Sequence, residues 1–250
     1  MRFLVFDTET TCKYPDRANI VQLAYIIVDL NDTDKHIEKK SRNTVISSTS
    51  DNHKIDSQLY TTITTRDMIV RPGKNVFISP EATAIHKISH RIAMVKGIPL
   101  EHALETFFND IRTHKPDVII AHNMTYDATV VKMEADRCER SDLYASDFTK
   151  HLCTMKSTTD FCKLSQKPTT NPRALKKRAE EEKRLGHPSY KWPKNDELYE
   201  KLFGSRPDHL TLHNALDDVM CTAVCAIELY NRGIISTKDF LTRDDYLAQR

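Results

Sequence analysis

The alternation of apolar and polar residues first indicates where the chain forms strands. Ile20 to Asp29 (IVQLAYIIVD) is apolar almost without a break, as expected for a strand that is covered on both faces. Shorter apolar runs at Arg2 to Phe6 and at Asp117 to Ala121 (DVIIA) end in polar residues and predict two more strands. Residues 58 to 70 are a further strand candidate.

Helical spacing and capping residues then predict the helices. Pro99 to His114 carries apolar residues at helical spacing and is stopped by Pro116. Asn171-Pro172 is typical of a helix start and Gly186 of a helix end. The expected helices span residues 80–86, 99–114, 125–138, 172–185, 196–203, 212–230 and 237–248. This order of elements predicts an α/β protein with a mixed sheet flanked by helices.

Two stretches are harder to assign to this pattern. Residues 31 to 52 are polar and contain turn dipeptides, which predict a hairpin turn, a short strand and a loop. Residues 150 to 194 are broken into short pieces by four prolines. Internal repeats and an inter-domain linker are not apparent in the sequence, so we expect one domain over residues 1–250.

Composition adds that this is an ordinary globular chain, with 39% hydrophobic and 29% charged residues. The sequence has no run of 18 apolar residues, and Met1 to Asp7 lacks the features of a signal peptide. The six cysteines form no C-x-x-C pair, which argues against a zinc ribbon, and Cys221 and Cys225 are spaced as on a buried helix face. We expect an intracellular protein that does not associate with membranes, in either cytoplasm or nucleus.

The net charge of +2 is nearly balanced, but basic residues concentrate between Lys163 and Lys194. Ten lysines and arginines lie in this range against three glutamates, and the wider segment of residues 156–195 also contains Phe161, Tyr190 and Trp192. Basic and aromatic residues together suit a single nucleic acid strand, and we hypothesise that this segment grips one. A solvated helix without a partner, with the aromatic residues as core anchors, is the competing interpretation.

The first candidate for chemistry is Asp7-Thr8-Glu9, directly after the apolar FLVF. Residues i and i+2 of a strand point to the same side, so both carboxylates share one face. Such a pair is costly to bury unless a cation joins it, and carboxylate oxygens suit Mg²⁺. A D-x-E triplet on an exposed loop would have no such meaning.

A second candidate follows the strand at residues 117–121 and opens the next helix. His122 and Asn123 stand there, with Asp127 in the first helical turn. Ligands of helix-flanked sheets gather beyond the carboxyl ends of strands. The alternative is that Asp127 only complements the helix dipole.

The third candidate opens the last long helix, where Asn214 is the expected N-cap. Asp217 and Asp218 would both lie in the first turn, either as partners of the helix dipole or, for one of them, as a metal ligand. His213, just before the helix, has the chemistry of a general base.

In this order the three motifs resemble those of the DEDDh 3′→5′ exonucleases of the DnaQ-like, RNase T-like superfamily, which includes proofreading epsilon-subunit-like proteins. The family pattern is D-x-E, then H-N-x-x-x-D, then H-x-x-x-x-D, matched here by Asp7/Glu9, His122/Asn123/Asp127 and His213/Asp218. Residues 85–89 and 197–204 resemble further family segments, and the likeness runs from residue 2 to about 231.

The resemblance implies a ribonuclease H-like (DnaQ-like) fold with a mixed five-stranded sheet, and a two-metal mechanism. Asp7, Glu9, Asp127 and Asp218 would hold two Mg²⁺ ions, for which Mn²⁺ substitutes. His213 would activate the attacking water, and the product would be a nucleoside 5′-monophosphate. The family spacing favours Asp218 over Asp217 as the ligand.

The resemblance also implies residues that contact the substrate. Thr10, Thr11, His86 and Asn123 would lie near the terminal nucleotide, although turn capping for Thr10 and a satisfied core position for His86 are equally open. Met124 and Tyr126 depart from the small residue and phenylalanine usual in the family. Residues 31–75 look like an insertion, and residues 156–195 like a basic extension.

The substrate class stays open at this stage. Removal of nucleotides from the 3′ end of single-stranded DNA, in proofreading or repair, is the first expectation, with a replication or repair protein such as a polymerase as possible partner. RNA trimming by the same site is the alternative within the family. A non-catalytic nucleic-acid-binding or scaffold protein, with residues 31–75 as its docking surface, is the alternative of another class.

Overall fold

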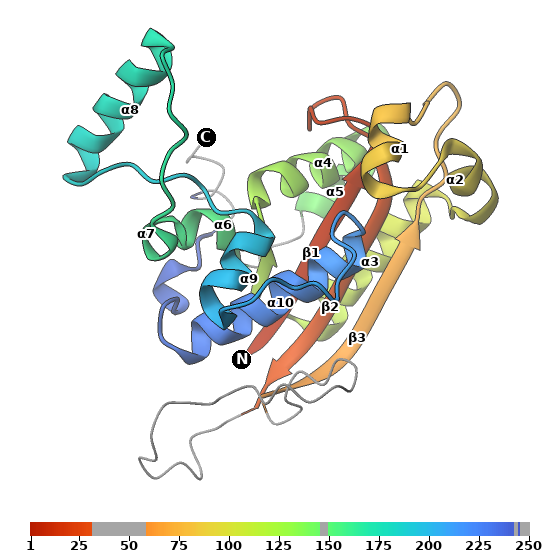
Figure 1. Ribbon diagram of the computed structural model, residues 1–250. Helices are drawn as coiled ribbons and strands as arrows, with labels where there is room; N and C mark the ends of the chain where they lie inside the picture. The colour runs from red at the N-terminus through yellow and green to blue at the C-terminus, as the bar shows by residue number, and fades with distance from the viewer. Residues whose placement is uncertain (32–58, 146–149, 243–244, 246–250) are drawn as a thin grey trace.

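The computed structural model describes residues 1–31, 59–145, 150–242 and 245. A mixed five-stranded sheet with strand order β3-β2-β1-β4-β5 forms its centre (Figure 1). The first three strands pair antiparallel, whereas β1, β4 and β5 run parallel. The strands are β1 Arg2–Thr10, β2 Ile20–Leu30, β3 Tyr60–Ile69, β4 Val118–Ala121 and β5 Lys150–Cys153.

Helices cover both faces of this sheet, which confirms the expected ribonuclease H-like architecture. The long helices α3 and α4 lie on one face, and α9 and α10 on the other (Figure 1). Shorter helices connect them. The helix bounds are α1 Pro80–His86, α2 His90–Lys96, α3 Leu100–His114, α4 Met124–Arg137, α5 Ser141–Ala145, α6 Thr154–Ser157, α7 Thr159–Cys162, α8 Pro172–Leu185, α9 Asn195–Phe203 and α10 Ala215–Asn231.

The double cover explains why β2 reads as continuously apolar. Leu23, Tyr25 and Ile27 face the cluster under α3 and α4, whereas Ala24, Ile26 and Val28 face the cluster under α10. Alternate residues of a strand point to opposite faces, so a strand between two helical layers needs apolar residues at every position. Cys221 and Cys225 of α10 are both buried, as their spacing on one helix face indicates, and Cys225 belongs to the second cluster.

Capping residues set several helix boundaries where the sequence places them. The side chains of Ser79 and Asn171 accept backbone N–H groups at the starts of α1 and α8. Gly186 ends α8 in the left-handed conformation, at φ 74°, which a residue without Cβ adopts readily. Among the helices that the structure describes, none is long and apolar enough to cross a membrane.

Two expectations at the level of elements need correction. The helix expected over residues 237–248 does not form at its start: Thr237–Asp239 is a short 3₁₀ turn, and Leu241 then exchanges two backbone hydrogen bonds with His151. The strand β5 was missed because its four residues are too few for a pattern. The expected turn, strand and loop over residues 31–52 lie almost wholly outside the described residues, and residues 60–69 of the suspected insertion form β3.

Candidate active site

The site begins at the carboxyl end of the central strand β1. Asp7 and Glu9 lie beyond the last β1–β4 pair, Val5 with Ile120, so this end of β1 is open on its β4 side. Their β2 partners are Ala24 and Gln22. Because they are two residues apart on one strand, both carboxylates emerge on the same face.

Asp127 reaches the same point from the first turn of α4. Its N-cap, Asn123, takes the left-handed conformation at φ 69°, which turns the chain sharply from β4 into the helix. The buried Asp127 carboxylate accepts hydrogen bonds from the Thr8 backbone N–H at 3.1 Å and the Thr8 hydroxyl at 2.7 Å. Thr8, the middle residue of the first motif, thus fixes the third carboxylate, and D-x-E spacing gives no signal for this role.

The loop before α10 separates the roles of Asp217 and Asp218. Asn214 caps the helix as expected, accepting from the N–H groups of Leu216 and Asp217. Asp217 turns away and accepts the Thr211 backbone N–H at 3.0 Å, whereas Asp218 accepts the His213 N–H at 2.7 Å. His213 itself is exposed at the mouth of this loop, at φ 70°.

Three of the carboxylates converge. One oxygen from each of Asp7, Glu9 and Asp218 lies within 4.8 Å of the other two. Asp127 lies beside this cluster rather than within that limit, held by Thr8. Oxygens on opposite sides of a Mg²⁺ ion are about 4.2 Å apart, so this donor set fits a divalent cation.

Electrostatics supports the same conclusion. Burial, reinforced by the charges of Asp127, Asp218 and Glu9, raises the pKa of Asp7 well above its usual range. Burial and the neighbouring Asp218 and Asp127 raise the pKa of Glu9 to about 8. Burial also raises the pKa of Asp127 to about 7, although its hydrogen bonds from Thr8 oppose this, and raises that of Asp218. Clustered carboxylates without a cationic partner are strained at neutral pH, and a bound cation would relieve this repulsion.

The four expected substrate residues have different surroundings. The Thr10 hydroxyl contacts the Tyr126 hydroxyl at 2.5 Å and the Cys12 carbonyl at 2.9 Å, and Thr11 accepts the Asn19 N–H. The Cys12 contact is local to the end of β1, whereas the Tyr126 contact joins it to α4 through the tyrosine that departs from the family pattern. His86 is buried, its Nδ1 accepts the Ile88 N–H at 3.1 Å, and burial lowers its pKa.

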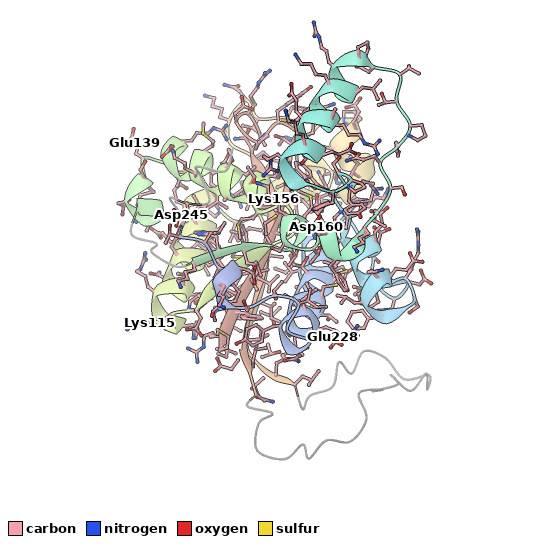
Figure 2. The ribbon with its side chains drawn as sticks, turned by 90° about the vertical axis from the view of Figure 1, so that its left-hand side faces the viewer. Lys115, Glu139, Lys156, Asp160, Glu228 and Asp245 are labelled. Carbon is pink, nitrogen blue, oxygen red and sulfur yellow. The ribbon has the colours of Figure 1, made fainter. Side chains whose placement is uncertain are left out.

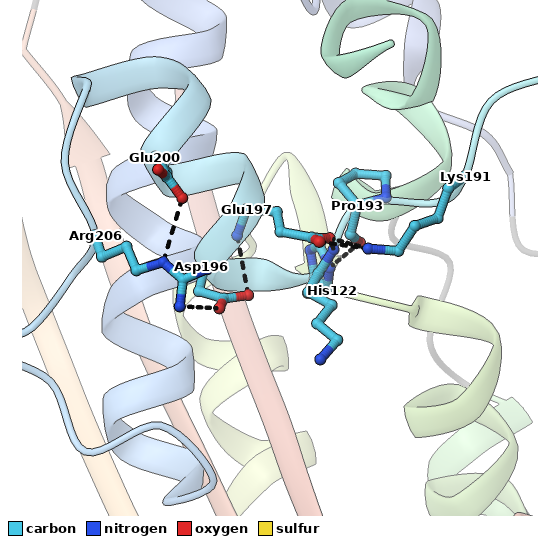
Figure 3. A network of polar contacts seen from close by, with 8 residues as sticks. His122, Lys191, Pro193, Asp196, Glu197, Glu200 and Arg206 are labelled. Carbon is cyan, nitrogen blue, oxygen red and sulfur yellow. Dashed lines mark hydrogen bonds and ion pairs between the residues drawn. The ribbon is translucent and has the colours of Figure 1, made fainter. Parts of the chain in front are cut away.

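His122 of the second motif is partly buried, and both of its ring nitrogens are engaged in contacts that join two segments of the chain. Its Nδ1 contacts the Thr154 hydroxyl at 3.0 Å, and its Nε2 contacts the Pro193 carbonyl at 3.0 Å, the latter shown in Figure 3. Burial lowers the pKa of His122 to about 4. The ring therefore stays neutral and joins the end of β4 to the segment that leads into α9.

Two further side chains position the site and carried no signal in the sequence. Asn195, at the start of α9, donates to the Asp218 carbonyl at 3.1 Å and to the Thr222 hydroxyl at 3.0 Å. Gln22 of β2 accepts the Ala215 N–H at 3.2 Å and donates to Asp67 at 2.6 Å. Both contacts join residues far apart in the chain, which spacing alone does not reveal.

Comparison with solved structures returns exonucleases. Escherichia coli exonuclease I in complex with a 5cy-dA13 oligonucleotide aligns with a TM-score of 0.59 at 15% identity, over 92% of this chain and 40% of that one. The nuclease domain of 3′hExo, a DEDDh family member bound to rAMP, aligns with a TM-score of 0.57 at 16% identity, over 97% of this chain and 96% of that domain. Cell-death related nuclease 4 (CRN-4) aligns with a TM-score of 0.54 at 13% identity, over 96% of this chain and 66% of that one.

These likenesses concern the fold. This chain spans about 40% of the length of the exonuclease I chains that it matches. No protein-family model matches the sequence, and no curated protein does. The expected resemblance is confirmed at the level of architecture: the chain has the ribonuclease H-like fold of the DEDDh exonucleases.

Proposed function

We propose that this protein is a metal-dependent 3′→5′ exonuclease that releases nucleoside 5′-monophosphates from the 3′ end of DNA. The observation that carries the proposal is the convergence of Asp7, Glu9 and Asp218 within 4.8 Å, with Asp127 beside them. The pKa values of these four carboxyl groups are raised, which means that keeping their negative charges together in the folded protein costs free energy. A cation-binding role accounts for that cost.

The side chains take the following roles in this proposal. Asp7, Glu9, Asp127 and Asp218 hold two Mg²⁺ ions, which Mn²⁺ replaces, and the ions supply the positive charge that a phosphodiester needs when water attacks it. His213, exposed on the loop before α10, accepts the proton of the attacking water. The hydrogen bond from the His213 N–H to the Asp218 carboxylate holds the loop that carries the general base next to this proposed metal ligand.

Several buried contacts keep these groups in place. Thr8 fixes Asp127, Asn195 fixes the first turn of α10, and Gln22 fixes its N-terminus. Ligand positions that are set by hydrogen bonds from neighbouring side chains are a general requirement of metal sites. Around them, Thr10, Thr11, His86 and Asn123 remain the proposed contacts of the terminal nucleotide.

DNA is the first substrate proposed and RNA the alternative. Exonuclease I from Escherichia coli is seen with DNA oligonucleotides, and the 3′hExo nuclease domain with rAMP. Both have the fold of this chain, so the fold does not choose between the two sugars. Groups that contact the 2′-hydroxyl make that choice. Proofreading or repair, with a polymerase or similar protein as partner, belongs to the same proposal.

The experiment follows 5′-labelled single-stranded DNA and RNA of equal sequence with Mg²⁺, with Mn²⁺ and with EDTA. We expect a ladder that shortens from the 3′ end with either metal and not with EDTA. Asp7→Ala and Asp218→Asn should each abolish it, lowering kcat by at least about 10³-fold. Asp217→Asn is the matched control and should retain activity, because the Asp217 carboxylate accepts the Thr211 N–H and, among the described residues, is not part of the carboxylate cluster.

Two outcomes would overturn the proposal. If neither strand is shortened while both still bind, the chain is a nucleic-acid-binding protein that keeps the fold. If Asp217→Asn is inactive and Asp218→Asn active, the assignment of the fourth ligand is wrong. The faster substrate decides between DNA and RNA.

A further inference from the structure

Residues 165–190 leave the body of the protein and return to it, and we call them the basic arm. A pair of main-chain groups closes its base: the Lys191 N–H donates to the Leu164 carbonyl at 2.8 Å. The Gln166 side chain adds a second link, to the Tyr190 carbonyl at 2.9 Å. Within the arm, the Glu182 carboxylate accepts hydrogen bonds from the Arg178 side chain and from the Ser189 N–H. The second of these bonds holds the segment after α8 against the helix. The arm is therefore a built substructure with a defined base.

Packing against the core does not explain α8. None of its residues is buried: of its two leucines, Leu175 is 47% exposed and Leu185 is partly exposed. Figure 1 shows the helix apart from the sheet and the other helices, and Figure 2 shows side chains projecting around it. A helix in a protein normally gains its stability from an apolar face that packs. An exposed 14-residue helix on a closed base points to a role in binding.

Charge identifies the class of partner. Residues 163–194 carry ten basic and three acidic residues, a net +7, so the other residues of this +2 chain carry a net −5. Two of the three glutamates are used within the helix, in the pairs Lys176–Glu180 and Arg178–Glu182. The exposed Arg173, Lys177, Lys183 and Arg184 form no ion pair with any residue that the structure describes. Such a surface fits a polyanion.

The base of the arm leads directly into the candidate active site. Lys191 pairs with Glu197, and the Pro193 carbonyl contacts His122 at 3.0 Å (Figure 3). Asn195 then donates to the Asp218 carbonyl. Trp192 lies between Lys191 and Pro193 in the chain and is 55% exposed. It is therefore not the core anchor that one interpretation of the sequence predicts. An exposed indole between Lys191 and Lys194 of this basic segment offers a stacking surface for a base.

We propose that the basic arm and Trp192 bind the single strand upstream of its 3′ end, with Trp192 stacking on a base and α8 following the phosphates. This rests on the proposed function. A 14-residue helix is about 21 Å long, the length of about six stacked nucleotides at 3.4 Å each. The arm therefore makes the enzyme favour strands several nucleotides longer than the active site itself needs.

The first test uses the fluorescence of Trp192, the single tryptophan of the chain. With EDTA present to keep the strand intact, dT20 and rU20 should quench it saturably, and the dinucleotide dT2, too short to reach from the site along the arm, should not. Because these variants lack the fluorophore, their affinity is read from the anisotropy of a 5′-labelled dT20: Trp192→Phe should retain most of the affinity and Trp192→Ala should lose about fivefold or more, as removal of a stacked base contact requires. Absence of quenching by both long strands would overturn the stacking role.

The second test neutralises the arm. Arg173, Lys177, Lys183 and Arg184 are changed together to Gln. The matched control changes Arg112, Lys115, Lys150 and Lys238, which are exposed at the opposite end of the sheet, where Lys115 is labelled in Figure 2. The arm variant should bind dT20 at least about tenfold more weakly in low salt, and its slope of log affinity against log salt should flatten by up to about 2.8, or 0.7 for each lost phosphate contact.

Activity separates this inference from the proposed function. The arm variant should raise KM for a 20-nucleotide strand and leave kcat, and the KM for a trinucleotide, close to the wild-type values. If it degrades the long strand with the KM of the control variant, the arm does not bind substrate, although the nuclease proposal stands. If the wild type binds dT20 through the arm and degrades nothing, the nuclease proposal fails and the binding surface stands.

Discussion

The carboxylate cluster leads to a prediction about stability that does not depend on activity. Glu9 is held beside Asp218 and Asp127, and burial with these charges raises its pKa from 4.5 to about 8. Glu9→Gln keeps the size of the side chain and removes the charge. We therefore expect the metal-free Glu9→Gln protein to be more stable than the wild type at alkaline pH.

The sign and size of the effect follow from proton linkage. Between pH 4.5 and 8 the folded state holds the Glu9 proton more tightly than the unfolded chain does, so the free energy of unfolding falls as pH rises through this window. A shift of about 3.5 pKa units corresponds to at most about 4 kcal/mol at pH 8. For a chain of 250 residues each kcal/mol moves Tm by about 2–4 °C.

The assay is a thermal melt in EDTA at pH 5 and at pH 8. Glu9→Gln should melt at least about 4 °C above the wild type at pH 8, and at nearly the same temperature at pH 5, where Glu9 is protonated in the fold. Glu139→Gln, an exposed glutamate labelled in Figure 2, is the control and should change Tm by little at either pH. Added Mg²⁺ should then raise the Tm of the wild type more than that of Glu9→Gln.

The refuting result is specific. If Glu9→Gln melts at or below the wild-type temperature at pH 8 in EDTA, Glu9 is not held against other carboxylates, and the electrostatic basis for a cation site fails. If it melts higher at pH 5 by the same amount, the gain comes from packing and not from the lost charge.

Two further predictions concern the residues that position the site. Thr8→Val should lower kcat by about 10–100-fold without a large change in Tm, because the hydroxyl that holds Asp127 is lost, and Thr8→Ser should restore it. If Thr8→Val is as active as Thr8→Ser, the hydroxyl does not have this role. His122→Phe should cost about 2–3 kcal/mol in urea unfolding at pH 7, because Thr154 and Pro193 lose a buried partner. In the folded protein the pKa of His122 is lowered from 6.5 to about 4, so the unfolded chain binds the proton first as pH falls through that window. The free energy of unfolding of the wild type should therefore fall by up to about 3 kcal/mol relative to that of His122→Phe. Equal pH profiles of the two proteins would refute this.

The local part of the architecture could be read from the sequence because its causes are local. A proline or asparagine at a helix start, a glycine at its end and an unbroken apolar run are short-range signals, and α1, α8 and β2 form within one or two residues of their expected bounds. Elements without such signals were missed or misplaced. The four residues of β5 are a strand because β4 and Leu241 offer their main-chain groups, and Leu241 is held in a bridge to His151 rather than in a helix for the same reason.

The sequence by itself determined which residues carry charge and chemistry: two carboxylates on one strand, one after the next parallel strand and one at a helix start. Tertiary structure alone decided how they meet. It turned Asp217 toward Thr211 and Asp218 toward the cluster, and it brought Thr8, Gln22 and Asn195 into hydrogen bonds with partners up to 193 residues away. It also left Trp192 in solvent and held the partly buried His122 between Thr154 and Pro193. Spacing along a chain fixes which face of an element a residue occupies, whereas burial and contact depend on what packs against that face.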